Sequence, residues 1–284
     1  ERTTWYLLPA PPIRLARSHA RALARRPCAY ALTLLRALGH RAPGLRGLLW
    51  SAFHFAESID LAAELERRGI EHVHNHFANS GATVGYLAAS YLDLAWSLTL
   101  HGSSEFDYPA GLLLPEKLEA AEFVACVTHF GRAQAMRMVD AKHGHKFHIV
   151  RAGIDPPIGL HPTRSGSHAT RPRFVCVARL APEKGHAGLL EAFAELIASG
   201  IDAELELLGD GPEAERIERV IDRLALRRHV VMRGQVPADE ALRAMSTATA
   251  VVLASFMEGL PVVLMEALAC GVPVIAPCVA GIPE

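Results

Sequence analysis

The chain has 284 residues, half of them hydrophobic, and its 29 Lys and Arg nearly cancel its 30 Asp and Glu, leaving a formal net charge of −1. This length favours about two domains, the apolar content excludes a disordered chain, and the balanced charge excludes a dedicated nucleic-acid binder. No run of about 18 apolar residues occurs, so we expect no membrane-spanning helix, and the first residues do not resemble a signal peptide.

The N-terminal part is basic and predicted to be helical. Between Arg2 and Ala56 there are nine Arg, interleaved with leucines, and no Asp or Glu. Breaks in the helices are expected at Pro27 and around 39–47. A basic amphipathic helix can lie on an anionic membrane surface. The alternative is a solvated helix face on a globular domain.

Helices and strands alternate along the rest of the chain. In the first half, helices are predicted over 58–68, 80–91, 115–125 and 130–141, and strands over 70–77, 96–102, 123–128 and 147–155. In the second half, strands are predicted over 173–179, 203–209, 229–234, 250–255 and 272–277, and helices over 185–200, 213–226, 239–248 and 261–271. Such alternation implies right-handed βαβ units and parallel sheets.

We therefore predict two doubly wound α/β domains, 1–155 and 173–284. A segment rich in Pro, Gly, Ser and His, 156–172, is predicted to be the linker between them. The chain starts without Met and stops directly after a strand, so we expect elements to be missing at both ends.

Polar residues follow several predicted strands, where doubly wound sheets bind their ligands. Arg179 ends one strand and Lys184 follows it, just before a helix. Two cations beside a helix N-terminus suit a diphosphate. The alternative is that both are solvated loop charges.

The helix predicted over 261–271 is apolar on every side except at Glu266, so we expect it to be buried. Pro261 suits its first position, and Gly271 suits the residue past its end. A buried carboxylate needs a partner. That partner is either a structural Arg or backbone amide, or a pair of sugar hydroxyls, because an ionised carboxylate only accepts hydrogen bonds.

Other signals are weak. The stretch GDGPEA, starting at Gly209, matches G-x-G-x-x-A after a strand, but Pro212 follows at once and the stretch is not in the first βα unit, so no dinucleotide site is expected. Two histidine groups lack the acids, thiols or spacing of a metal site: His72, His74 and His76, which would share one strand face, and His143, His145 and His148. Five separated cysteines without a CxxC pair indicate reduced thiols in a cytosol.

Several segments together resemble the family-4 retaining glycosyltransferases of the GT-B fold, and most closely the bacterial colanic-acid and exopolysaccharide branch. The first half contributes HNHFANSGATVGYLA, LTLHGSSEFD and VRAGID. The second half contributes VARLAPEKGHAGLLEAFAEL, LLGDGPEAERIE, VVMRGQVP and SFMEGLPVVLMEALACGVPVIAPCVAGIPE. The resemblance implies two Rossmann-like domains facing a cleft, the first binding the acceptor and the second the nucleotide sugar.

The resemblance also implies the reaction. A sugar would pass from a UDP- or GDP-sugar to a glycan or lipid-linked acceptor in polysaccharide biosynthesis, with retention and without an obligatory metal. The protein would be cytoplasmic, with a peripheral contact to the inner membrane through its Arg-rich helices. Two alternatives stay open: a GT-B-like sugar-nucleotide epimerase, and an inactive truncated remnant that binds nucleotides.

Site residues follow from the same resemblance. It implies that His101 contacts the donor sugar near the reacting carbon, Glu258 the donor sugar, and Glu266 the ribose hydroxyls. It assigns the diphosphate to Arg179 and Lys184, and to backbone N–H groups of Gly259, Leu260 and Pro261. Gly209 and Gly211 would line the nucleotide pocket, with Gln235 near the base.

Three departures from the family pattern stand out. We expect the usual first strand with its Gly-rich loop to belong before the first residue and further elements to belong after GIPE, and Ala254 stands where Pro often precedes Ser.

Overall fold

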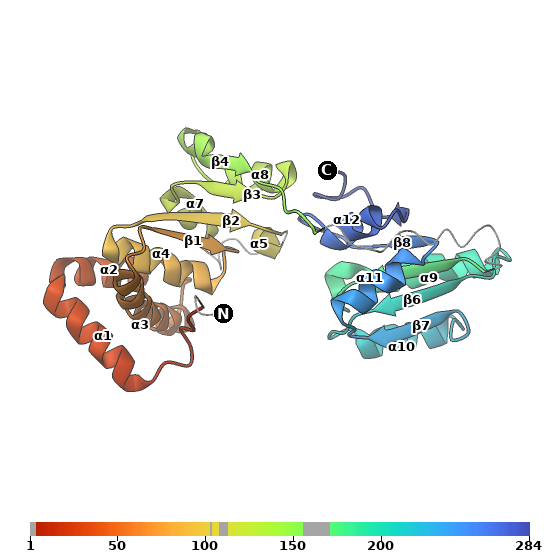
Figure 1. Cartoon of the computed structure of the whole chain (residues 1–284), viewed down its shortest axis with the longest axis horizontal. Coiled ribbons are helices and arrows are strands. Elements are labelled where there is room, and N and C mark those ends of the chain that lie inside the picture. The colour runs from red at the N-terminus through yellow and green to blue at the C-terminus, as the bar shows by residue number, and fades with distance from the viewer. Residues whose placement is uncertain (1–3, 103, 108–112, 156–170) are drawn as a thin grey trace. The chain divides into compact units, whose positions relative to one another are not determined.

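The chain divides into two compact units, Glu1–Arg151 and Ala152–Glu284. The computed structural model describes residues 4–102, 104–107, 113–155 and 171–284 (Figure 1). Apart from Arg171 and Pro172, the predicted linker 156–172 lies outside the described residues.

Unit 1 holds a parallel sheet in the order β1-β2-β3-β4, together with a layer of helices. Its elements are α1 (Pro12–Arg25), α2 (Pro27–Gly39), α3 (Leu45–Arg68), β1 (His72–His76), α4 (Ser80–Leu92), β2 (Ala95–Leu100), α5 (Ser104–Asp107), α7 (Leu114–Ala120), β3 (Val124–Cys126), α8 (His129–Met136), a 3₁₀ turn (Ala141–Lys146) and β4 (Phe147–Ile149).

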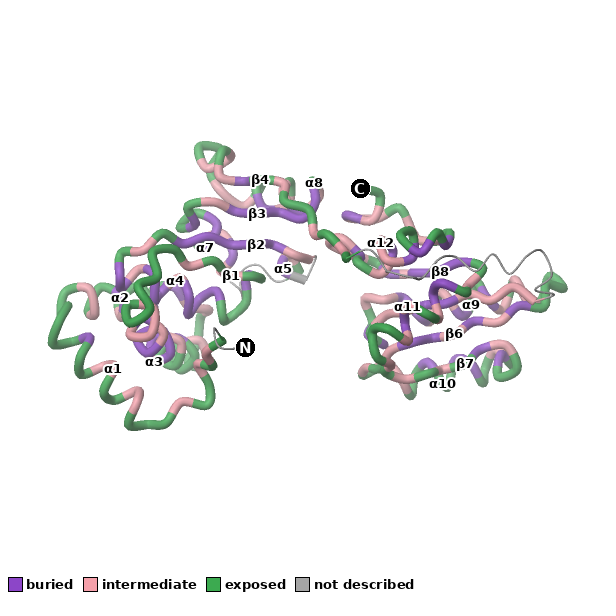
Figure 2. The backbone as a smooth tube through the Cα atoms, viewed as in Figure 1, coloured by how far each residue is buried: buried purple, intermediate pink, exposed green. Residues whose placement is uncertain are grey.

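Helix α4 lies between the sheet and the N-terminal helices, because it contacts β1 and β2 as well as α2 and α3. One apolar cluster joins it to β2, β3 and α7, and a second joins it to α1, α2 and α3. Figure 2 shows α1 mostly exposed and β2 and β3 largely buried. The N-terminal helices are therefore held mainly through α4.

The predicted breaks between the N-terminal helices are confirmed, but α3 is longer than expected. Pro27 begins α2 and Gly39 ends it, whereas the helix predicted over 58–68 starts at Leu45. Gly47, expected at a break, lies inside α3, where a Cβ would overlap the carbonyl oxygen of Ala42. The glycine is needed for close packing of the preceding turn, which an apolar pattern does not reveal.

The basic N-terminal segment is partly neutralised by acids later in the chain. Arg14 Nε lies 2.9 Å from Asp60 and Arg25 lies 3.3 Å from Glu66, both on α3. Ser18 also donates to Asp60, at 2.8 Å. The charge asymmetry of the sequence is therefore smaller in the folded unit.

Unit 2 is doubly wound, with a parallel five-stranded sheet in the order β7-β6-β5-β8-β9. Its elements are β5 (Arg173–Val177), a 3₁₀ turn (Pro182–Lys184), α9 (His186–Ala198), β6 (Glu204–Leu208), α10 (Ala214–Arg223), β7 (Val230–Gly234), α11 (Ala238–Ser246), β8 (Ala250–Val252), α12 (Val262–Ala269) and β9 (Val274–Ile275).

Two apolar clusters occupy the two faces of this sheet. Cys176 packs with α9 and α10, whereas the adjacent Val175 packs with α11 and α12. Successive strand residues point to opposite faces, so these neighbours show that helices cover both sides. The predicted α/β fold with two parallel sheets is confirmed.

We expect Leu98→Ala in β2 to destabilise unit 1 by about 2–5 kcal/mol, because Leu98 is fully buried and the substitution leaves a cavity. Urea unfolding followed by circular dichroism measures this. Leu32→Ala in α2 is the matched control: this leucine is 64% exposed, so its loss should change stability by less than about 0.5 kcal/mol. Equal effects of the two substitutions would contradict the placement of the core.

Candidate functional site

The strand order of unit 2 creates a switch point between β5 and β8. From β5 the chain moves outward through β6 and β7, then returns to β8 on the other side of β5. The connections that follow β5 and β8 therefore run in opposite directions. In sheets of this kind, ligands bind at the carboxyl ends of the strands at such a point. The segments 178–185 and 253–261 follow these two strands. They are joined by a backbone hydrogen bond of 2.9 Å from Phe256 N–H to the Glu183 carbonyl.

Lys184 and Glu258 meet across the switch point. Lys184 Nζ donates to Glu258 Oε1 at 2.5 Å, with side chains only 22% and 13% exposed. The buried Ser255 hydroxyl donates to the same oxygen at 2.6 Å. Among the described residues, Glu258 Oε2 therefore has no partner, and an ammonium group has three donors. Both groups retain capacity for a ligand.

Glycines bring the surrounding backbone close together. Gly185, beside Lys184, has φ +66°, and a Cβ there would overlap the carbonyl oxygen of Ala254. Gly209 and Gly211 meet the segment that carries Arg179 in the same way, against the carbonyl groups of residues 178 and 180. The nucleotide-lining role of these two glycines stays a prediction.

Arg179 is in the same loop as Lys184 but has a different partner. It is 67% exposed and donates to Glu183 at 2.5 Å. The carboxylate of Glu183 accepts a hydrogen bond from its own backbone N–H as well as from Arg179, and both lower its pKa. An exposed pair of this kind contributes little to stability, so Arg179 can exchange this partner for a ligand at small cost.

Helix α12 is buried on one side only, so the prediction that it is buried all round is wrong. Leu264 and Ala267 pack into the core, whereas Val262 is 42% and Leu268 59% exposed. A short surface helix needs only one apolar face for packing, and the extra apolar residues are left outside.

Glu266 lies half-buried in the second turn of α12. Burial raises the pKa of its carboxyl. No hydrogen bond or ion pair to this side chain occurs within the described part of the chain, so neither the expected structural Arg nor a backbone amide is its partner. It therefore forms no hydrogen bond or ion pair with Lys184, Glu258 or Arg179.

The segment before α12 offers backbone donors at two of the three predicted positions. The N–H groups of Gly259 and Leu260 have no acceptor among the residues that the structure describes. Pro261 has no N–H, so its assignment as a donor is wrong. It also occupies the N-cap, one position before the predicted start of the helix.

Two further predicted residues belong to other elements of the fold. Gln235 is exposed and follows β7, the outermost strand of the sheet. His101 belongs to unit 1, where it directly follows β2. Within unit 2, Gln235 forms no described hydrogen bond or ion pair with the other predicted residues.

A buried acid holds the loops around His101. The Glu105 carboxylate of α5 accepts hydrogen bonds from the backbone N–H groups of Ala78 at 2.6 Å, His101 at 2.7 Å and Gly102 at 3.0 Å. Burial raises the pKa of Glu105, and these hydrogen bonds oppose that rise. The sequence analysis did not single out Glu105. The signal that could have found it is an acid three residues after the His-Gly pair of LTLHGSSEFD.

Histidine side chains cluster at the same end of unit 1. His101 Nε2 lies 2.6 Å from His76 Nδ1, and the Phe77 ring lies 4.6 Å from the His101 ring. His72 and His74 share the face of β1 with His76, as predicted, and bond Ser97 and Thr99 of β2. No group of three or more potential metal ligands occurs among the described residues.

Comparison with known proteins finds a family model that is similar to most of the second unit. Residues 160–284 match the family model described as "Glycosyl transferases group 1". The switch-point residues of unit 2 lie within this matched segment.

Two curated relatives agree with this family. The chain is 39% identical over 121 residues to the GDP-mannose-dependent alpha-(1-6)-phosphatidylinositol monomannoside mannosyltransferase of Mycolicibacterium smegmatis, covering 40% of this chain and 32% of that protein. It is 34% identical over 145 residues to the putative colanic acid biosynthesis glycosyltransferase WcaL of Escherichia coli, covering 49% and 36%. The matched segments thus span about a third of each relative's length.

A solved structure extends the similarity to most of the chain. HepE of Anabaena, in complex with UDP and glucose, superposes with a TM-score of 0.63 at 21% identity, covering 78% of this chain and 63% of that one. At this identity the likeness shows the fold, which is the GT-B glycosyltransferase fold.

Glu266→Gln tests whether the unpartnered carboxylate destabilises the protein when no ligand is bound. The folded-state pKa of Glu266 is raised above 4.5, so the folded protein favours the protonated carboxyl. The stability that this provides is complete below pH 4.5 and is lost as the pH rises through the folded pKa. We expect the variant to be more stable than the wild type at pH 7, by up to about 0.5 kcal/mol, with no difference below pH 4.

Thermal unfolding at the two pH values measures this. Glu218→Gln, on the exposed side of α10, is the control and should show no pH-dependent difference. A Glu266→Gln variant that is less stable at pH 7 would mean that the carboxylate has a structural partner.

Proposed function

We propose that this protein is a retaining glycosyltransferase that transfers a sugar from a UDP- or GDP-sugar to a glycan or lipid-linked acceptor in polysaccharide biosynthesis. The contact between Lys184 and Glu258 across the switch point carries the proposal, because a cation that suits a diphosphate lies beside an acid that suits sugar hydroxyls. The relatives named for GDP-mannose and for colanic acid, and the fold neighbour complexed with UDP, support a donor of this class.

The diphosphate leaving group sets the main chemical demand. Negative charge grows on it as the glycosidic C–O bond breaks, and preorganised donors stabilise such charge. We assign this role to Arg179, Lys184 and the N–H groups of Gly259 and Leu260, with no obligatory metal. The departing phosphate would accept the proton of the acceptor hydroxyl on the same face, so no protein nucleophile is required.

The two acids orient the donor in this proposal. Glu258 Oε2 accepts from sugar hydroxyls while Oε1 remains bonded to Lys184 and Ser255. Glu266 accepts from the ribose hydroxyls, which would supply the partner that its half-buried carboxylate lacks. Sequence resemblance supports His101 at the donor sugar and Gln235 near the base.

We also propose a peripheral contact with an anionic membrane surface on the cytoplasmic side. The membrane contact is supported by large apolar side chains that are exposed beside arginines on the N-terminal helices, including Leu32, Leu35, Leu45 and Leu49. The cytoplasmic side is supported by the five cysteines, which are all free thiols. No described helix is long and apolar enough to cross a membrane. Co-sedimentation with phosphatidylglycerol vesicles that persists unchanged in Leu45→Asp/Leu49→Asp would contradict this contact.

Arg179→Ala combined with Lys184→Ala should weaken binding of UDP or GDP by at least about tenfold, because each lost charge-assisted hydrogen bond costs roughly 1.5–3 kcal/mol. Binding of the free nucleoside should change little. Isothermal titration calorimetry measures both ligands. Arg223→Ala, an exposed arginine on α10, is the control; an equal loss for nucleotide and nucleoside would refute the diphosphate role.

The same proteins can be assayed for turnover with UDP- and GDP-sugars and a lipid-linked acceptor. A product with the donor's anomeric configuration, formed equally with and without EDTA, supports the proposal. Isomerised donor without transfer would instead support an epimerase. Nucleotide binding without turnover would support a binding remnant.

A further inference from the structure

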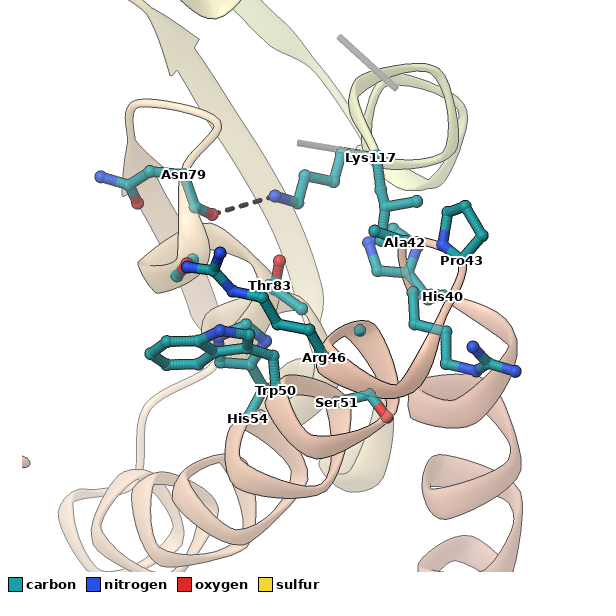
Figure 3. A pocket seen from close by; sticks show the side chains of 14 residues that line it. His40, Ala42, Pro43, Arg46, Trp50, Ser51, His54, Asn79, Thr83 and Lys117 are labelled. Carbon is teal, nitrogen blue, oxygen red and sulfur yellow. Dashed lines mark hydrogen bonds between the residues drawn. The ribbon is translucent and has the colours of Figure 1, made fainter. Parts of the chain in front are cut away.

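A basic cavity lies in unit 1, apart from the residues assigned above. Its volume is about 430 Å³, within the range of small-molecule sites. Its walls come from the turn before α3, the first half of α3, the start of α4 and the start of α7. Figure 3 shows Lys117 reaching from α7, and Arg46 from α3, toward the amino end of α4.

Every ionisable side chain that lines the cavity is a base. These residues are His40, Arg41, Arg46, His54 and Lys117, and no Asp or Glu is among the described lining residues. Arg46 is exposed and forms no ion pair within the described part of the chain. No carboxylate among the described lining residues therefore offsets the charge of Arg46.

Lys117 is the most deeply placed of these cations. Its side chain is among the largest that are fully buried, and Nζ donates to the carbonyl oxygens of Ala78 at 2.6 Å and Asn79 at 2.9 Å. An ammonium has three donors, so one remains for the cavity. Burial, opposed by Glu105 and Glu116, lowers the pKa of Lys117 to about 7.

Two histidines in the wall each have one ring nitrogen without a hydrogen-bond partner. His40 is 8% exposed, and Nε2 of both His40 and His54 is buried without a partner. Burial, together with the charges of Lys117 and His54, lowers the pKa of His40 to about 4. Burial and the charge of Lys117 therefore favour the neutral forms of His40 and His54.

The amino end of α4 adds backbone hydrogen-bond donors and a partial positive charge to the cavity. Asn79 caps this 13-residue helix by accepting from Gly81 N–H at 2.9 Å. The N–H of Ser80 has no acceptor among the described residues. The positive end of the helix dipole and a free amide favour an anion at this position.

We propose that this cavity binds a phosphomonoester group, held by Arg46, Lys117 and the amino end of α4, with His40 as a further donor. A phosphate supplies acceptor oxygens to several donors at once, and a guanidinium bonds it in bidentate fashion. The half-exposed Trp50 ring beside it leaves room for the apolar face of the attached group. Taken with the proposed function, on which this last step rests, the ligand is a phosphorylated acceptor.

Calorimetry with glycerol 3-phosphate tests the site. Arg46→Glu should weaken binding by at least about tenfold, whereas Arg67→Ala, an exposed arginine on the same helix, should leave it unchanged. Lys184→Ala should also leave glycerol 3-phosphate binding unchanged. Binding of UDP and GDP should instead be weakened by Lys184→Ala and unchanged by Arg46→Glu. Failure of this site and failure of the donor site are therefore distinguishable.

Vesicles separate the two sources of a phosphomonoester. Arg46-dependent binding of glycerol 3-phosphate assigns a water-soluble ligand. Arg46-dependent binding only to phosphatidic acid vesicles, and not to phosphatidylglycerol vesicles of equal charge density, assigns a lipid headgroup. The proposal is overturned if Arg46→Glu binds both probes as the wild type does, or if Lys184→Ala abolishes binding of glycerol 3-phosphate.

Discussion

The contact between Lys184 and Glu258 is the constraint around which the candidate donor site is built. An ion pair that is mostly removed from water contributes little net stability, because desolvation offsets the Coulomb attraction. Its structural consequence is positional: it joins the loop after β5 to the loop after β8. The buried Ser255 hydroxyl orients the shared carboxylate, and Gly185 lets the two loops approach.

Unit 1 joins its loops by a related arrangement. There the Glu105 carboxylate binds backbone N–H groups that follow β1 and β2, and Lys117 binds carbonyl groups of the first of these loops. Buried charges satisfied by backbone groups are specific in geometry, since each lost partner leaves a costly unpaired charge. In both units, an acid therefore determines how the ends of adjacent strands are arranged.

Groups that the free protein leaves unsatisfied mark the proposed binding sites. The Glu266 carboxylate has no described partner, and burial raises its pKa. The cavity of unit 1 gathers cations without an acid among the described lining residues. Such arrangements cost stability, and perturbed groups of this kind concentrate where ligands bind. A nucleotide sugar and a phosphorylated acceptor would supply the missing charges and hydrogen bonds.

The sequence by itself determined the alternation of strands and helices, because short apolar runs bounded by Gly and Pro leave few alternatives. Its resemblance to a glycosyltransferase family also predicted ligand-binding roles for Lys184 and Glu258, which stay predictions. It could not show that these two side chains meet, that Gly47 lies inside α3, or that α12 exposes Val262 and Leu268. Those facts, like the basic cavity, depend on contacts between segments distant along the chain, and only the tertiary structure decides which of them pack together.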